Sequence, residues 1–254
     1  MTRRHAVVAQ GTPVGRQASA SSRRRPLRLA VFDLDGTLKE AFSPWRYLHV
    51  ALGFEKEADE YRARFLAGEI DYVEWARLDT ALWKGQPLAK VETIFRNNAY
   101  RPGVHELFQW LQRRMVRTAI VSTGLDVQVR QVASELGVWR SACNELVVEG
   151  GRLTGEALIH VTEHSKGEVM ARLRAEASAL PAECLAVGDG PADVQLFAQA
   201  GLSVAVCPRD DQVRDAADVV VEDGDLSVII PLLRQHFRFE GWPCAETDAL
   251  RPRQ

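Results

Sequence analysis

The chain has 254 residues, of which 46% are hydrophobic and 26% are charged, and its formal net charge is −2. This length allows one substantial core with a smaller module, and no apolar run approaches the roughly 20 residues that a bilayer span needs. The first 28 residues hold seven arginines and no acid, so the rest of the chain is clearly acidic, a poor balance for a protein that binds nucleic acid.

Both ends of the chain differ in composition from the middle. Residues 1–27 are rich in Arg, Ser, Ala and Gly without an apolar period, which predicts a disordered basic extension; a transit-like segment and a misassigned start are the alternatives. Residues 238–254 predict a loosely ordered tail. The four cysteines are scattered without a C-x-x-C pair, which favours reduced thiols in a cytoplasmic protein.

The first predicted strand ends in a pair of carboxylates. The apolar run at 29–32 leads into Asp33, Asp35 follows two positions later, and Gly36-Thr37 breaks the strand. At the carboxyl end of a parallel strand, these side chains would enter the crevice where α/β proteins hold ligands. One carboxylate can act there as a nucleophile and the other as a general acid and base. Taken alone, the pattern also fits a polar turn or a metal-binding loop.

A long segment separates this strand from the next crossover helix, which begins near residue 102. About 65 residues are too many for a structureless loop, and apolar residues at helical spacing predict four short helices within them. Three tryptophans predict a small helical core. We expect a helical insertion over residues 43–100, placed beside the first strand where it can act as a lid.

From residue 102 onward, strand and helix patterns alternate. Strands are expected at 117–122, 184–187, 202–206 and 219–221, helices at 103–115, 125–136, 166–177, 192–199 and 226–236, and a hairpin at 144–159 that turns at Gly150-Gly151. This order predicts an α/β fold with a doubly wound, mostly parallel sheet, formed by residues 28–42 and 101–237.

Two later segments place phosphate-binding groups at element ends. The strand at 117–122 ends in Ser122-Thr123-Gly124, where a hydroxyl and backbone amides that open a helix can hold phosphate, although Ser is also an everyday helix cap. Lys166 lies where a helix begins, and the helix dipole disfavours a cation there. A nearby acidic or phosphate-bearing site would explain this lysine; the alternative is a solvated surface residue.

A second group of acids follows the strand at 184–187. Asp189 and Asp193 lie in the sequence Gly-Asp-Gly-Pro-Ala-Asp, which is also compatible with a common turn. With Asp33 and Asp35, Asp189 would complete an oxygen-rich site whose carboxylates repel one another unless a cation neutralises them. Mg²⁺ prefers one or two carboxylates, waters and a substrate phosphate, and is the expected ion.

These four segments, in this order, resemble the motifs of the haloacid dehalogenase superfamily, specifically its phosphoserine-phosphatase-like branch. Residues 33–37 are similar to the first motif, 121–124 to the second, Lys166 to the third and 188–193 to the fourth. The hairpin and the helical insertion, which would be a C1-type cap, also look like this branch. The resemblance covers residues 28–237 and implies a Rossmann-like core with a small helical cap.

The resemblance implies a Mg²⁺-dependent phosphomonoester hydrolase that acts on a small phosphorylated metabolite. Asp33 would attack phosphorus and form an aspartyl-phosphate, and Asp35 would protonate the leaving alcohol and then activate water. Asp33, the backbone carbonyl of Asp35 and Asp189 would hold Mg²⁺. The second acid, Asp35, favours phosphate esters, because a dehalogenase of this superfamily needs only the first.

The resemblance also implies a group of phosphate-binding and supporting residues. Ser122, Thr123, Gly124 and Lys166 would bind phosphate oxygens, and Lys166 would also orient the nucleophile. Asp193 would support Lys166 and the metal.

The chain differs from this branch at the positions that recognise the substrate. Phosphoserine phosphatases place a glutamate shortly after the first motif to meet the substrate ammonium; the corresponding residue here is Phe42, and Glu40 comes two residues early. The arginine that recognises the substrate carboxylate in that branch has no clear match; the candidates, each of which also suits a helix surface, are Arg46, Arg62, Arg64 and Arg77. We expect Glu40 and Trp45 to shape specificity, although Trp45 also suits the core of the insertion. The sequence leaves the alcohol open, phosphoserine included.

Two other functions stay open on the same fold: a phosphotransferase that uses an alcohol acceptor, and a non-catalytic protein that binds a phosphate ligand. A monomer or a homodimer is expected, in the cytoplasm, with no nucleic-acid or membrane partner.

Overall fold

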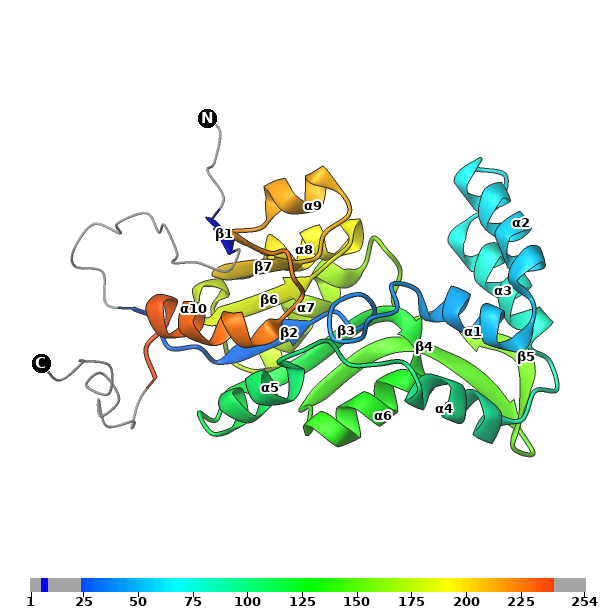
Figure 1. Cartoon of the computed structure of the whole chain (residues 1–254), viewed down its shortest axis with the longest axis horizontal. Coiled ribbons are helices and arrows are strands. Elements are labelled where there is room, and N and C mark those ends of the chain that lie inside the picture. Colours follow the sequence, from blue (N-terminus) through cyan, green and yellow to red (C-terminus); the bar gives the residue numbers. More distant parts are fainter. Residues whose placement is uncertain (1–5, 9–23, 240–254) are drawn as a thin grey trace, which may run out of the picture.

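The computed structural model describes residues 6–8 and 24–239, in which the strands form one sheet (Figure 1). The strands are β1 (Ala6–Val8), β2 (Leu29–Phe32), β3 (Arg117–Leu125), β4 (Arg140–Glu149), β5 (Arg152–Leu158), β6 (Cys184–Gly188), β7 (Leu202–Val206) and β8 (Val219–Val221). Their order is β1-β8-β7-β6-β2-β3-β4-β5, and all neighbours are parallel except the antiparallel pair β4–β5. The predicted α/β fold with a mostly parallel sheet is confirmed.

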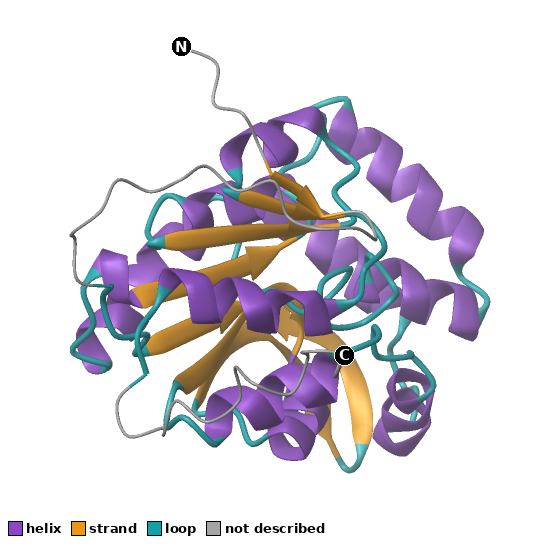
Figure 2. Cartoon of the chain, turned by 60° about the vertical axis from the view of Figure 1, so that its left-hand side comes forward, coloured by secondary structure: helices purple, strands orange, loops and turns teal. Residues whose placement is uncertain are grey.

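Helices cover both faces of this sheet (Figure 2). They are α1 (Pro44–Leu52), α2 (Glu55–Leu66), α3 (Tyr72–Leu82), α4 (Leu88–Arg96), α5 (Val104–Gln112), α6 (Asp126–Leu136), α7 (Lys166–Glu176), α8 (Val194–Phe197), α9 (Asp211–Ala216) and α10 (Ile229–His236). The apolar sides of α5, α6 and α10 pack in one cluster against the sheet, and those of α7, α8 and α9 pack in another on the opposite face. Within the described residues, none of the helices has the length and apolar character that a membrane span requires.

The first four helices lie together at the β5 end of the sheet (Figure 1). Trp83 is fully buried among them, and its Nε1 donates to Nδ1 of His49 at 3.1 Å. The apolar cluster around it also includes Leu146 and Leu153 of the β4–β5 hairpin, so these helices share their core with the hairpin. Four short helices bury little apolar surface by themselves, which explains why they need this second layer. The division into a core domain and a cap at 43–100 stays a prediction.

The N-terminal segment differs in part from the expected disorder. Ala6–Val8 pairs in parallel with β8, and Leu27 is buried in the core. The physical reason is that β8 would otherwise leave unpaired backbone groups at the sheet edge, and a short run with two valines suits that position. Residues 1–5, 9–23 and 240–254 lie outside the described residues, and so do the corresponding parts of the predicted extension and tail.

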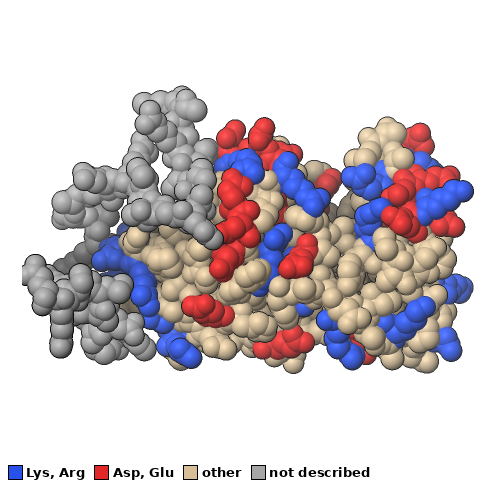
Figure 3. Space-filling model, in the orientation of Figure 1, with Lys and Arg blue, Asp and Glu red and all other residues tan. Residues whose placement is uncertain are grey.

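The sheet order brings three strand ends together. β2 lies between β6 and β3, with Phe32 in register with Val187 on one side and Ile120 on the other. The residues that follow these three parallel strands therefore leave the sheet at one edge. Over the face shown in Figure 3, acidic and basic side chains are interspersed.

Candidate active site

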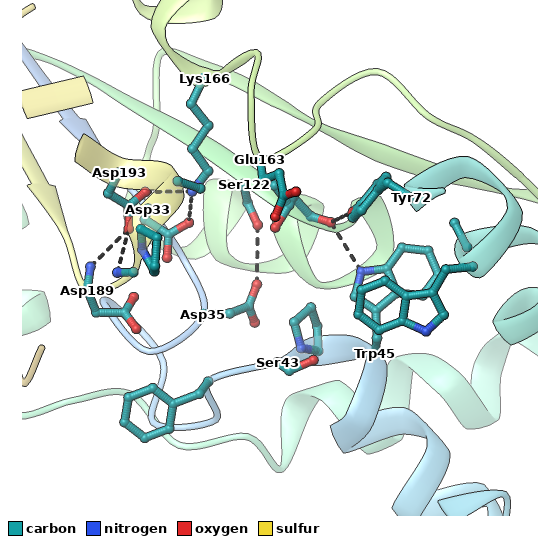
Figure 4. Close-up of a pocket in the computed structure, with 18 of the residues that line it drawn as sticks. Asp33, Asp35, Ser43, Trp45, Tyr72, Ser122, Glu163, Lys166, Asp189 and Asp193 are labelled. Carbon is teal, nitrogen blue, oxygen red and sulfur yellow. Dashed lines mark hydrogen bonds and ion pairs between the residues drawn. The ribbon is translucent and has the colours of Figure 1, made fainter. Parts of the chain in front are cut away.

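Lys166 bridges two carboxylates at the carboxyl edge of the sheet (Figure 4). Its Nζ lies 2.6 Å from Oδ1 of Asp33, after β2, and 2.7 Å from Oδ1 of Asp193, and all three side chains are buried. The other oxygen of Asp193 accepts hydrogen bonds from the backbone N–H groups of Asp189 and Gly190, both at 3.0 Å. The lysine at the start of α7 is therefore a buried site residue, and its cation lies directly beside Asp33.

The acids of the site have raised pKa values because they are buried close together. Burial raises the pKa of Asp33 to about 6, against the opposing attraction of Lys166. Burial and then repulsion from Asp33 raise the pKa of Asp35 to about 7. The same two causes hold the pKa of Asp189 well above its usual value. Burial lowers the pKa of Lys166, but Asp193 and Asp33 outweigh it and raise it overall. The cluster has more negative than positive charge.

This excess of carboxylate fits a divalent cation. Oxygens of Asp33, Asp189 and Asp193 lie within 4.8 Å of one another. Thr37 orients Asp189 through a 2.8 Å hydrogen bond to Oδ1, and a Cβ at Gly36 would lie 2.3 Å from Oδ2, so only glycine leaves room for this carboxylate. Because Asp193 is already engaged by Lys166 and two amides, Asp33 and Asp189 are better placed to hold a hard divalent cation, which oxygen ligands suit.

Asp35 faces the second phosphate-binding segment. Its Oδ2 accepts from Ser122 Oγ at 3.2 Å and its Oδ1 accepts from Gln128 Nε2 at 2.6 Å. The amide of Gly124 donates to Ser122 Oγ at 2.8 Å, and a Cβ at this glycine would lie 2.6 Å from Asp35 Oδ2. These contacts fix the Asp35 carboxylate, and they require glycine at position 124.

A cavity of about 260 Å³ lies between the sheet edge and the first helices. Trp45 Nε1 and the Tyr72 hydroxyl both donate to the backbone oxygen of Thr123, at 3.1 Å and 3.3 Å, so α1 and α3 contact the end of β3 that carries Ser122 (Figure 4). The cavity is small for a ligand site, which suits a small metabolite. The first helices form one wall of the cavity and the strand ends form the other, so a ligand there lies between the two.

Most of the predicted site residues meet at this cavity. Those that line it are Asp33, Asp35, Trp45, Ser122, Thr123, Lys166, Asp189 and Asp193. Gly124 lies directly behind Ser122, with its amide turned to that hydroxyl. Glu40 is exposed and is not among the lining residues, whereas Phe42 is. The structure thus places Glu40 outside the lining of the cavity, and the roles assigned to it and to the other residues stay predictions.

Among the residues of the site that were not predicted, Thr37, Gln128 and Asn144 hydrogen-bond to predicted site residues. Asn144 Nδ2 donates to the backbone oxygen of Thr123 at 2.9 Å. Thr37 belongs to the first motif, which is a signal for its position. Gln128 lies in the first turn of α6, and Asn144 lies in a predicted strand. Polar residues at such positions are often exposed to solvent, so nothing in the local sequence marks these two as parts of a site.

Comparison with known proteins places this geometry in a family. The model of the haloacid dehalogenase-like hydrolases matches residues 30–198, which is well over half of the chain. The chain belongs to this family. The hydrolase is 29% identical over 82% of its length to a phosphoserine phosphatase of Methanocaldococcus jannaschii, of which it covers 98%. It is 32% identical over 80% of its length to one from Wolinella succinogenes, again covering 98%.

Solved structures agree with these relatives. The hydrolase superimposes on a substrate-bound phosphoserine phosphatase with a TM-score of 0.71 at 26% identity, covering 84% of this chain and all of the other. A phospho-aspartyl intermediate analogue of phosphoserine phosphatase gives a TM-score of 0.70, with the same identity and coverage. The chain is a phosphoserine-phosphatase-like hydrolase, a phosphatase of the phosphoric monoester class, as its motifs predicted.

Proposed function

We propose that this hydrolase cleaves the phosphate monoester of a small metabolite in two steps, through an aspartyl-phosphate on Asp33. The observation that carries the proposal is the buried Asp33 carboxylate held 2.6 Å from Lys166, with Asp35 beside it in the lining of the same cavity. The names of the relatives support the substrate class, a small phosphorylated compound.

In the first step, an oxygen of Asp33 attacks phosphorus and the bond from phosphorus to the alcohol oxygen breaks. Asp35 gives its proton to that oxygen, and a pKa of about 7 lets it carry the proton near neutral pH. In the second step, Asp35 takes a proton from water, whose oxygen attacks phosphorus. The bond from phosphorus to Asp33 breaks, and inorganic phosphate leaves.

The remaining residues position the phosphate. Lys166 and the Ser122 hydroxyl bind its oxygens, with Thr123 and Gly124 shaping the loop around them. Asp193 holds Lys166 through their 2.7 Å contact. Asp33, Asp189 and the backbone carbonyl of Asp35 would hold Mg²⁺, which supplies neutralisation of the phosphate charge when bound.

The test is phosphate release from a panel of small phosphomonoesters, with Mg²⁺ and with EDTA, by wild type and Asp33→Asn. We expect release that needs Mg²⁺ and falls by at least about 10³-fold in Asp33→Asn, because an amide cannot form the acyl-phosphate. Phosphate release that continues in Asp33→Asn, or no release from any ester by folded wild type, would contradict the proposal.

We also propose that the protein is cytoplasmic and that it is a monomer or a homodimer. Cell fractionation would test its location, and light scattering would test its oligomeric state.

A further inference from the structure

The part of the cavity formed by the first helices is mostly apolar. Trp45 of α1 and Tyr72, Trp75 and Ala76 of α3 line it, together with Asp79 one turn further along α3. The hydrogen-bonding groups of Trp45 and Tyr72 are both engaged by the Thr123 carbonyl, so these two rings offer their faces and edges to a ligand (Figure 4). A ligand body that contacts them gains most if it is apolar or aromatic.

Asp79 is a buried carboxylate in the lining of this cavity. The residue is 2% exposed, and its Oδ1 has no hydrogen-bond partner among the described residues. Its Oδ2 lies 3.3 Å from Nε2 of His49. Because Nδ1 of His49 accepts from Trp83, the proton of the neutral ring is on Nε2, facing Asp79. The carboxylate thus has His49 beside one oxygen and no hydrogen bond at the other, so it lacks the donors that a buried anion needs.

The charges around the cavity oppose a substrate carboxylate. Among the described residues that line it, Lys166 alone has a cationic side chain, and Asp33 and Asp193 already engage it. Glu163 adds another acid to the lining. The nearby guanidinium groups of Arg101 and Arg209 lie over the ring of Phe42, at 5.5 Å and 3.3 Å from its centroid, and neither residue lines the cavity.

We propose that the substrate is a phosphate ester of a small amino alcohol that lacks a carboxylate, with an apolar or aromatic body against Trp45 and Trp75 and its amine on the carboxylate of Asp79. A buried acceptor without a partner is costly, and a cationic donor satisfies it with a charge-assisted hydrogen bond. The same acid, with Glu163, repels an anionic substrate end, which gives specificity by exclusion. The inference rests on the proposed phosphatase function for its catalytic readout.

The simpler explanation is that Asp79 only holds His49 in the core of the helices. That role does not require Asp79 to line the cavity, and it predicts no effect of Asp79 on the choice between substrates. The two explanations therefore differ in a ratio of activities rather than in stability or in total activity.

Two pairs of esters test the effect of a substrate carboxylate on activity. Phosphoethanolamine is phosphoserine without the carboxylate, and tyramine phosphate is phosphotyrosine without it. We expect kcat/KM to be at least ~10-fold higher for the decarboxylated member of each pair, and highest for tyramine phosphate. Equal values within both pairs, or higher values for the carboxylates, would overturn the inference.

A third comparison isolates the amine and its partner. The ratio of kcat/KM for tyramine phosphate to that for 4-ethylphenyl phosphate, which lacks the amine, should fall about 10-fold in Asp79→Asn. The asparagine oxygen can still face His49, so the variant keeps the core contact. Glu60→Gln on α2 removes one exposed acid and is the matched control, with an unchanged ratio. An unchanged ratio in Asp79→Asn as well would assign this residue to structure alone and overturn the inference.

A binding experiment separates the inference from the proposed function. Tyramine should raise the Tm of wild type but not of Asp79→Asn, whereas 3-(4-hydroxyphenyl)propionate, with a carboxylate in place of the amine, should raise neither. If no ester is hydrolysed but this pattern holds, the hydrolase proposal fails and the inference stands. If esters are hydrolysed but tyramine gives no shift at concentrations above its KM as the phosphate, the inference fails alone.

Discussion

The carboxylate of Asp35 is held by a short chain of hydrogen bonds that leads out of the site. Gln128 donates to it at 2.6 Å, and the carbonyl of the same side chain accepts from Asn98 Nδ2 at 3.2 Å. Asn98 Oδ1 accepts in turn from the backbone N–H of Ala41 at 3.3 Å. Residues 41 and 98 lie where the chain enters and leaves the first four helices, so this chain of bonds ties Asp35 to both connections.

At the residue scale, we predict that Gln128→Ala lowers kcat by about 10-fold or more and changes KM little. The reason is that a hydrogen bond to a charged group contributes about 1.5–3 kcal/mol, and Asp35 acts in the transition state rather than in substrate binding. Steady-state kinetics with an ester that wild type hydrolyses measures kcat and KM separately. Gln131→Ala is the matched control, because Gln131 lies on the same helix but donates to the Glu92 carbonyl, away from the site. An equal loss of kcat in Gln128→Ala and Gln131→Ala would show that Gln128 has no specific role in catalysis.

Among the elements, the end of the β4–β5 hairpin is fixed to the phosphate loop by one side chain. Asn144 is fully buried, and its Nδ2 donates to the carbonyls of Thr123 and Val161 at 2.9 Å and 3.0 Å. Its Oδ1 accepts from the backbone N–H groups of His160 and Val161 at 2.8 Å and 2.9 Å. This one amide thus joins β4, the loop after Ser122 and the segment that leads to α7.

At the element scale, Asn144→Ala should lower the free energy of unfolding by about 2–4 kcal/mol, since it leaves buried amides and a carbonyl without partners. Urea unfolding followed by tryptophan fluorescence measures it. Thr154→Ala, in the same hairpin, removes a 3.2 Å bond to the Val147 carbonyl at a half-buried position, and should cost less than about 1 kcal/mol. If the free energy of unfolding falls by the same small amount in both variants, Asn144 does not anchor the hairpin as proposed.

These examples indicate what the sequence can and cannot predict. β6 and β7 are found from sequence because both faces are buried, which demands a continuous apolar run. Asp33 and Asp189 are found because they follow such runs. Strand β1 is missed because its partner, β8, is distant in sequence. Helix α9 is missed because its sequence is mostly polar and has no apolar residues repeating at helical spacing. Gln128 and Asn144 are missed for the same reason as β1, since their partners come from other elements.

Across the whole molecule, the acidic cluster opposes folding when no cation is bound. The pKa of Asp33 rises from its usual 3.8 to about 6 in the folded protein, and that of Asp189 rises well above its usual value. A group with a raised folded pKa contributes stability that is fully present below the unfolded pKa and lost as pH rises through the folded value. In metal-free protein, these acids therefore reduce stability between about pH 4 and neutral pH, and a bound cation would reverse this.

The prediction at this scale is that Asp189→Asn and Mg²⁺ have opposite effects on thermal stability. Without metal at pH 7.5, Asp189→Asn should raise Tm by about 2–4 °C, the change expected for ~1 kcal/mol in a protein of this size, because it removes a buried charge while Thr37 keeps an acceptor. Mg²⁺ at 100 times its Kd should stabilise wild type by about 2.7 kcal/mol, and the variant by much less. Scanning calorimetry with EDTA and with Mg²⁺ measures all four states, with Glu60→Gln as the control for the loss of one exposed acid. A lower metal-free Tm in Asp189→Asn, or the same Mg²⁺ shift in both proteins, would mean that the cation binds elsewhere.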